Sequence, residues 1–354
     1  MKSASNMYKQ ERRSRSPPSP IKTNNESPQQ DRSIGQYTVG WICALQEEYE
    51  TACRMLDDEF DGPQTSEVND NNTYAFGCIG SHSVVIGCLP AGRCGNNSAA
   101  RVARDMVRSF PNLRFALMVG IGGGAPTLER DIRLGDVVVS TPHNGFGGVV
   151  QYDFGKRLPD GQFKQTGQLN APPEVLLGVL PELQRRHNDP RKPDRLAKHL
   201  ERMDDMPDYQ RPKHDRLYHT DYSHQGGGKH CDLCGADKLL QRPERQSRRA
   251  VTVHYGTIAS GNSVIKDAVA RDKYANDPEL HMLCFEMEAA GLMNNLPCLV
   301  IRGVCDYSDS HKNDDWHKYA ALTAAAYARE LLLVLKPTKV DVMLPWAAKL
   351  DDGT

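Results

Sequence analysis

Continuous apolar runs separated by polar segments divide the first third of this chain into predicted strands and helices. The runs at 37–45 (YTVGWICAL), 83–92 (SVVIGCLPAG) and 115–120 (FALMVG) are typical of strands that are buried on both faces. The segment 93–110 carries apolar residues at helical spacing, which predicts a loop leading into a helix with one buried stripe. This alternation favours a mostly parallel sheet covered by helices, and therefore an α/β core.

The same pattern returns in the second half of the chain. Strands are predicted at 136–140 (DVVVS), 251–261 (VTVHYGTIASG) and within 297–308 (PCLVIRGVCDYS). A long helix is predicted at 316–335, and Pro337 is expected to close it.

Three polar segments interrupt or flank this core. Residues 1–36 are rich in Ser, Pro, Asn, Gln and Arg, so we expect a disordered tail. Residues 181–249 are dense in charged residues and Pro, which favours an insertion on the surface. With 338–354 interpreted as a C-terminal tail, the chain is predicted to form one domain over 37–337.

Composition excludes some classes of partner. The 354 residues carry a formal net charge of −1 with acids and bases evenly spread, so no basic face for nucleic acid is expected. No apolar run reaches the roughly 20 residues that span a bilayer, and the N-terminal residues lack the apolar core of a secretory signal. We expect a soluble, cytoplasmic protein that binds neither nucleic acid nor a membrane.

The ten cysteines divide into two kinds. Most lie in apolar runs, where a thiol behaves as a small hydrophobic group, and this favours a reducing compartment. Cys231 and Cys234 instead form a C-x-x-C in a polar loop with His219, His224 and His230 nearby. The pair is open to three interpretations: half of a zinc site, a redox pair or chance. These two cysteines are weak metal candidates, and neither a metal nor a cofactor is expected.

Carboxylates follow several of the predicted strands. Glu48 lies just past the first strand, Glu286 and Glu288 follow a strand-like run, and Asp306 ends the run LVIRGVCD. Ligands collect at the carboxyl ends of parallel strands, so these acids can share one pocket. Taken singly, Glu48 can also serve a helix N-terminus and Asp306 can cap a turn. The glycine run 122–124 is expected to form a turn.

Six segments in order resemble the nucleoside phosphorylase superfamily, which includes purine and uridine phosphorylases and methylthioadenosine/adenosylhomocysteine nucleosidases. The segments are VGWICALQEEYETA, AGRCGNNSAA, MVGIGGGAP, TIASGNSVI, FEMEAAG and VIRGVCDYSD. The resemblance is closest to the nucleosidase-like branch and to phosphorylase-type domains of fungal immune-receptor-like chains. It implies a single α/β domain with a mixed, partly barrel-like central sheet flanked by helices, and a homo-oligomer.

The resemblance also implies roles for the acids. Asp306 is expected to protonate N7 of a departing purine, which lowers the barrier to its release. Glu288 is expected to accept the ribose hydroxyls and to favour the positive charge that develops on the sugar. Met287 would form an apolar wall under the ribose, and Glu286 would share the hydroxyl contact or position a water. Glu48 is expected to orient and deprotonate the attacking water.

The remaining site residues come from the same comparison. Phe285 would stack on the purine, and the amides of Gly122 and Gly123 would approach the nucleophile side of the sugar. Arg93 is a cation that can contact a phosphate. The base contacts are expected from Val264, Ile265, Asn262 and Ser263.

The nucleophile separates the branches of this superfamily. Phosphorylases present an Arg and a hydroxyl residue where this chain has Met118 and Ile121, neither of which binds phosphate through its side chain. Glu48 would repel a phosphate dianion, so hydrolysis is favoured. An adenine substrate is favoured, with ATP or another adenine nucleotide ahead of free nucleosides. A phosphorylase and a non-catalytic nucleotide-sensing module remain alternatives.

Overall fold

The computed structural model describes residues 33–63, 69–159 and 163–351. The predicted tail therefore lies almost wholly outside the described residues, and its last part forms the 3-10 turn η1 (Ile34–Gln36). Across the described part of the chain, no helix combines the length and the apolar character that crossing a membrane requires.

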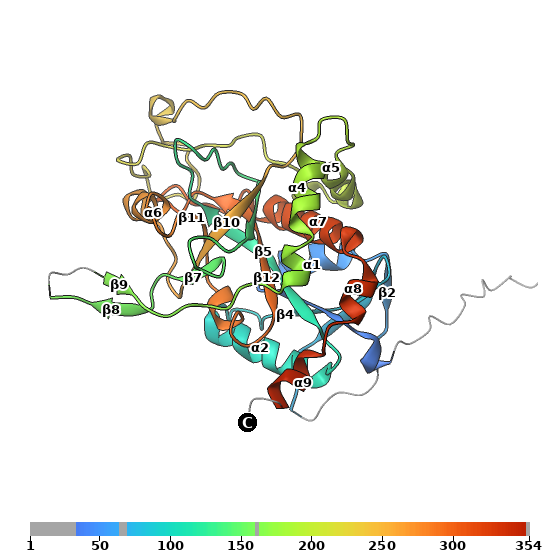
Figure 1. The fold of residues 1–354 in the computed structure, drawn as a ribbon. Helices are drawn as coiled ribbons and strands as arrows, with labels where there is room; N and C mark the ends of the chain where they lie inside the picture. The colour runs from blue at the N-terminus through green and yellow to red at the C-terminus, as the bar shows by residue number, and fades with distance from the viewer. Residues whose placement is uncertain (1–32, 64–68, 160–162, 352–354) are drawn as a thin grey trace, which may run out of the picture. The chain divides into compact units, whose positions relative to one another are not determined.

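Five strands of the central sheet close on themselves (Figure 1). The parallel pairs are β12–β5, β10–β6 and β10–β11, and the antiparallel pairs β12–β6 and β11–β5 complete the ring. The prediction of one α/β domain with a mixed, partly barrel-like sheet is confirmed. The ring strands are β5 (Phe115–Gly124), β6 (Val137–Ser140), β10 (Val253–Ser260), β11 (Met282–Glu286) and β12 (Cys298–Asp306).

An open wing extends from β5. Its first strand, β1 (Val39–Cys43), is parallel to both β5 and β4, and β3 and β2 follow in antiparallel pairing. The other wing strands are β2 (Asp58–Phe60), β3 (Tyr74–Ile79) and β4 (His82–Cys88). On the far side of the ring, β7 (Val149–Gln151) pairs with β10, and β8 (Gly155–Arg157) and β9 (Phe163–Gln165) form a separate hairpin.

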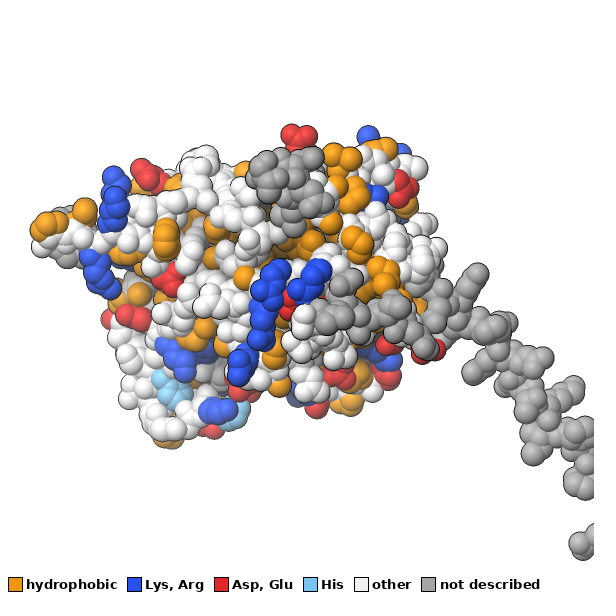
Figure 2. All heavy atoms as spheres, turned by 90° about the horizontal axis from the view of Figure 1, so that it is seen from below, with side chains coloured by type: hydrophobic (Ala, Val, Ile, Leu, Met, Phe, Trp, Pro, Cys, Tyr) orange, Lys and Arg blue, Asp and Glu red, His pale blue; other side chains and the backbone are white. Residues whose placement is uncertain are grey.

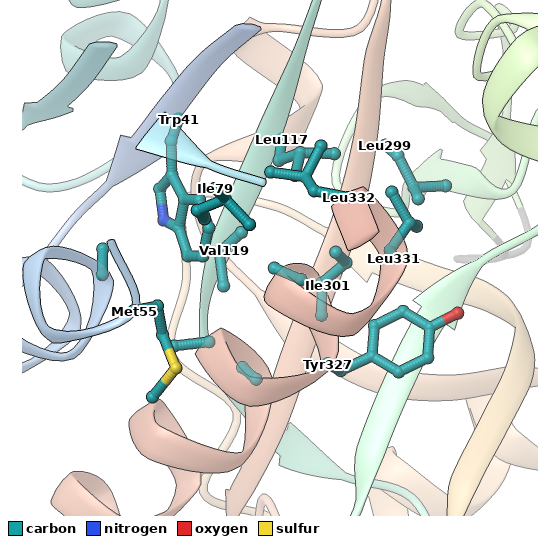
Figure 3. Close-up of a cluster of buried hydrophobic side chains, with 14 of the residues drawn as sticks. Trp41, Met55, Ile79, Leu117, Val119, Leu299, Ile301, Tyr327, Leu331 and Leu332 are labelled. Carbon is teal, nitrogen blue, oxygen red and sulfur yellow. The ribbon is translucent and has the colours of Figure 1, made fainter. Parts of the chain in front are cut away.

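Helix α7 (His317–Val334) covers the strands where the ring meets the wing. Figure 3 shows its Tyr327, Leu331 and Leu332 facing apolar side chains from the sheet and α1, among them Ile301. A Cβ at Gly303 would overlap the backbone of Ala320, so glycine lets α7 approach β12 closely. Burial of this cluster contributes to the stability of the domain.

Helix α2 (Asn96–Ser109) forms where the apolar spacing predicts it, and α1 (Gln46–Arg54) follows β1. The buried stripe of α2 packs into the core, while Arg101, Arg104 and Arg108 are exposed on its opposite face. Figure 2 views the molecule from below and shows Lys and Arg side chains lying among hydrophobic and acidic ones.

The polar segment 181–249 is only partly a surface insertion, and the expectation needs correction for residues 181–209. Leu183, Leu196, Met203 and Tyr209 are buried in the main core. They belong to α4 (Leu180–Asn188), α5 (Arg195–Leu200), η2 (Glu201–Met203) and η3 (Pro207–Tyr209), and α3 (Glu174–Leu177) precedes them. These apolar positions form no clear pattern in the sequence, because each short helix buries only one or two side chains and the segment is dense in charged residues. Farther along, η4 (Ala236–Lys238) and α6 (Ala268–Ala275) are the remaining helices before β11 among the described residues.

The predicted C-terminal tail is wrong for residues 338–351. Pro337 does not end α7 but begins α8 (Pro337–Asp341), where a proline at the first helical position costs no hydrogen bond. Val340 is buried, and the indole N–H of Trp346 donates to the carbonyl of Asn295, which places α9 (Trp346–Asp351) against the core.

Candidate active site

Glu48 is held by three backbone amides at the carboxyl end of β1. It lies in the first turn of α1, and its Oε2 accepts from the amides of Ala44 (2.6 Å) and Leu45 (3.1 Å). Its Oε1 accepts from the amide of Ile121 at 2.8 Å, which ties α1 to β5. Burial raises the pKa of Glu48 even though the nearby Arg302 and these amides oppose the shift. The carboxylate therefore has a fixed position and holds a proton more readily than an ordinary glutamate.

Arg302 is the central charge of this site, and the sequence reasoning assigned it no role. Its side chain, on β12, is fully buried, and its Nη2 contacts Glu286 and lies 3.4 Å from Glu288. Burial alone would lower the pKa of Arg302, but the surrounding carboxylates outweigh burial and raise it. Among the described residues, nothing accepts a hydrogen bond from its Nε or Nη1. The signal that could have revealed it is an arginine inside the apolar run LVIRGVC.

Gly120 leaves space for Arg302 and Glu48 to approach each other. A Cβ at this position would overlap both the Glu48 carboxylate and Nη1 of Arg302. The unpartnered Nη1 and the Glu48 Oε1 therefore lie over the same point of β5.

Glu286 and Glu288 have different surroundings although they are two residues apart. Glu286 accepts from the amides of Glu288 and Ala289, both at 3.0 Å, and pairs with Arg302, so its carboxylate closes the turn after β11. That turn leads into η5 (Ala289–Gly291). Glu288 accepts a longer hydrogen bond, 3.3 Å, from the amide of Gly95. Burial raises the pKa of Glu288 to about 7. The positive charge of Arg302 opposes this shift, and the negative charge of Glu286 adds to it.

Asp306 lies at the end of β12 beside the glycine run. Its Oδ1 accepts from the amide of Ser308 at 2.7 Å, and its Oδ2 is 2.8 Å from the ammonium of Lys312. Burial alone would lower the pKa of Lys312, but the charge of Asp306 raises it overall. The carboxylate is thus paired with an ammonium group in this conformation.

The glycine run is the end of strand β5, so the prediction of a turn is wrong. Gly123 pairs with Phe285 of β11 on one side and with Asp306 of β12 on the other. A Cβ at Gly123 would overlap Ser308 and Asp306, so glycine is required by the close approach of the strands and not by the geometry of a turn.

A cavity of about 180 Å³ brings most of the predicted residues together. Its lining includes the predicted Glu48, Gly122, Gly123, Ser263, Val264, Ile265, Phe285, Glu286, Met287 and Glu288. Cys94, Ile121, Ser308, Lys312 and His317 also line it, and the sequence reasoning gave these side chains no role in binding.

Three predicted residues lie outside that lining. Asp306 borders an adjoining cavity of about 420 Å³, and Lys312 lines both cavities. Asn262 accepts a hydrogen bond from the amide of Asn96 (3.4 Å), and Arg93 is exposed in the loop before α2.

Comparison with known proteins identifies the family. Residues 38–336 match the model of the phosphorylase superfamily. The chain belongs to this superfamily. The match spans every strand of the ring and all the acids described above.

Relatives of this superfamily member differ in length. A nucleotide-binding leucine-rich repeat (NLR)-like protein of Hyaloscypha variabilis is 45% identical over 306 residues, covering 85% of this chain and 30% of the relative. The ATP nucleosidase Cap17 of Escherichia coli is 24% identical over 243 residues, covering 67% of this chain and 39% of the relative. The chain thus spans 30% of the length of the first relative and 39% of the length of the second. A 5'-methylthioadenosine/S-adenosylhomocysteine nucleosidase of Mycobacterium tuberculosis is 24% identical over 306 residues. This alignment covers 84% of this chain and 96% of the relative.

Solved structures share the fold. A Helicobacter pylori methylthioadenosine nucleosidase with 5'-methylthioadenosine in the active site aligns with a TM-score of 0.52 at 14% identity, over 84% of this chain and 98% of that one. A putative nucleosidase of Borrelia burgdorferi bound to adenine aligns at 0.53 and 17% identity, over 84% and 100%. At these identities the likeness establishes the architecture.

Proposed function

We propose that this chain is a purine nucleosidase that uses water to hydrolyse the N-glycosidic bond of adenine nucleotides or nucleosides. The observation that carries the proposal is that Glu48, held by the amides of Ala44, Leu45 and Ile121, lines the same cavity as Glu288. A fixed carboxylate in this cavity suits a water molecule, which donates a hydrogen bond and then a proton to it.

Each bond change and proton transfer of the proposed reaction can be assigned to these residues and water. The C1′–N9 bond breaks, its electron pair goes to the base, and Asp306 supplies a proton to N7. Water adds to C1′ and gives its proton to Glu48. Glu288 accepts the ribose hydroxyls, and its charge stabilises the cation-like sugar in the transition state. Because Asp306 is paired with Lys312, we infer that this contact opens and Asp306 takes up a proton when a base enters.

Water is favoured over phosphate as the nucleophile by the charges around the cavity. Glu48 and Glu288 are both buried carboxylates within it, and they would repel a phosphate dianion. Arg302 is already paired with glutamates, and the side chain of Met118 is apolar and buried. The nucleophile side therefore has no uncommitted cation among the described lining residues.

An adenine nucleotide is the favoured substrate, and ATP is favoured slightly. The similarity to the ATP nucleosidase Cap17 supports this choice. Lys312 lines the cavity, and Arg93 is exposed next to the lining residue Cys94, so positively charged side chains lie at or beside the cavity that a 5′-phosphate would enter. The similarity to an NLR-like protein supports a role as an immune effector module in the cytoplasm.

The substrate is tested by incubating the protein with ATP, AMP, adenosine and inosine and measuring the free base by chromatography. We expect the largest kcat/KM for ATP, and we expect Asp306→Asn to reduce it by about 100-fold or more. A higher kcat/KM for adenosine than for ATP would overturn the nucleotide preference. Failure to release base from any of the four would favour the sensing module instead.

A further inference from the structure

Two cysteines and two histidines meet beside the segment that carries Asp306. Cys231 and Cys234 come from the loop that follows the buried helices of the polar segment, and His224 precedes them in the same loop. His311 belongs to the chain just after β12. Neither the fold nor the reaction described above uses this group of side chains.

The distances fit tetrahedral coordination. The Sγ atoms of Cys231 and Cys234 each lie 3.6 Å from Nδ1 of His311. Ligands at Zn–S of about 2.3 Å and Zn–N of about 2.0 Å, arranged tetrahedrally, stand roughly 3.5 Å apart. A ligand nitrogen of His224 lies within 4.8 Å of both sulfur atoms. Both sulfurs are thus already separated from Nδ1 of His311 by the spacing of two ligands on one zinc ion, and His224 lies close enough to complete the group.

A backbone carbonyl holds Nε2 of each imidazole ring. Nε2 of His311 is 3.0 Å from the carbonyl of Tyr222, and Nε2 of His224 is 3.2 Å from the carbonyl of His230. A carbonyl can only accept, so each Nε2 carries the proton and each Nδ1 keeps its lone pair. This second contact is the arrangement that metal-ligating histidines generally have.

The surroundings also favour a preformed site. Cys231 and His311 are buried, and the ring of Tyr218 stacks on that of His311 with centroids 3.9 Å apart. Both cysteines are free thiols. A redox pair would not need a histidine whose Nδ1 lies 3.6 Å from both sulfurs, with a second histidine beside them.

We propose that Cys231, Cys234, His224 and His311 bind one Zn²⁺ ion as a structural site. Four protein ligands leave no open position for a substrate, which distinguishes this site from catalytic zinc. Binding releases two thiol protons, because the ligands are thiolates and neutral imidazoles. His311 directly precedes Lys312, the partner of Asp306, so the ion fastens the 222–234 loop to the segment that ends the active site.

Zinc content measured on the purified, tag-free full chain tests the site. The protein is exposed to Zn²⁺, and weakly bound metal is then removed with a weak chelator. Mass spectrometry is expected to find about one zinc ion per chain. Replacement by Co²⁺ is expected to give the thiolate-to-cobalt charge-transfer band and the visible bands of tetrahedral cobalt. Both spectra are measured on the unaltered protein, so the outcome does not depend on whether a variant folds.

Variants assign the ligands. Cys234→Ser and His311→Ala are expected to lose the zinc and the cobalt bands, while His219→Ala, an exposed histidine of the same loop, keeps both. Substoichiometric zinc in the unaltered chain, without cobalt bands, would overturn the proposal. Full zinc retention by both ligand variants would overturn it as well.

Discussion

At the scale of single residues, the site is a group of buried charges that neutralise one another only in part. Arg302 faces Glu286 and Glu288 directly and acts on Glu48 from nearby. The sequence could reveal the acids, because each follows an apolar strand. It could not reveal how the roles of the acids differ. Backbone amides donate to Glu286, and these hydrogen bonds depend on the conformation of the turn after β11.

Replacement of Arg302 by methionine is expected to destabilise the protein strongly. The change leaves buried carboxylates without their counter-charge, which costs about 3–5 kcal/mol of unfolding free energy. Urea denaturation followed by circular dichroism measures the loss. Arg101→Met, at an exposed position of α2, should change stability by less than about 0.5 kcal/mol. Equal effects of the two changes would contradict the role given to Arg302.

The raised pKa of Glu288 predicts how activity depends on pH. Its pKa of about 7 means that the carboxyl is largely neutral below that pH, and a neutral group does not stabilise a cation-like sugar. The kcat/KM for base release is therefore expected to fall about tenfold per pH unit below about 7. The same shift lowers the free energy of unfolding as pH rises toward 7, because the folded state holds this proton more tightly. A kcat/KM that stays level down to pH 5 would rule out this titration.

At the scale of elements, continuous apolar runs located the strands, helical spacing located α2, and a long helix was predicted where α7 lies. The apolar pattern itself could not show the closure of the ring, which only the family resemblance implied, because closure depends on the pairing of β11 with β5 across about 160 residues. That pairing converts the glycine run from an expected turn into a strand. The buried helices α4 and α5 escaped prediction for a local reason, since charged residues surround their few apolar positions.

Gly303→Ala tests the contact between α7 and β12. The new Cβ would overlap the Ala320 backbone, and moving the helix away costs about 3 kcal/mol at the upper end of the range for overpacking. Gly35→Ala is the matched control, because nothing lies within 4 Å of the Cβ it would add. Thermal unfolding should separate the two variants clearly. An unchanged midpoint for Gly303→Ala would show that this packing is more tolerant than the structure implies.

At the scale of the whole molecule, the β8–β9 hairpin and its flanks expose apolar side chains. Phe154, Leu158 and Phe163 are between 38% and 58% exposed, and the hairpin extends away from the ring in Figure 1. An exposed apolar surface of this kind is typical of an interface. It gives a place for the homo-oligomer that the family resemblance implies.

Light scattering coupled to size-exclusion chromatography tests this expectation. The unaltered chain is expected to elute at a multiple of its 39.4 kDa mass, and Phe154→Ser combined with Phe163→Ser is expected to shift it toward the monomer. A control change at Leu128, which is fully exposed in a different loop, should leave the mass unaltered. A monomeric unaltered chain at high concentration would contradict the prediction.

The central claim is that water, activated by Glu48, attacks the sugar. Its most direct test is adenine release from ATP or adenosine in phosphate-free buffer, with the sugar product followed by phosphorus and proton NMR. We predict release without phosphate, no ribose 1-phosphate when phosphate is added, and a loss of 100-fold or more, on the order expected for a general base, in Glu48→Gln. Glu50→Gln, in the same helix but bonded to Tyr209, should keep full activity. Base release that requires phosphate and yields ribose 1-phosphate would contradict the account.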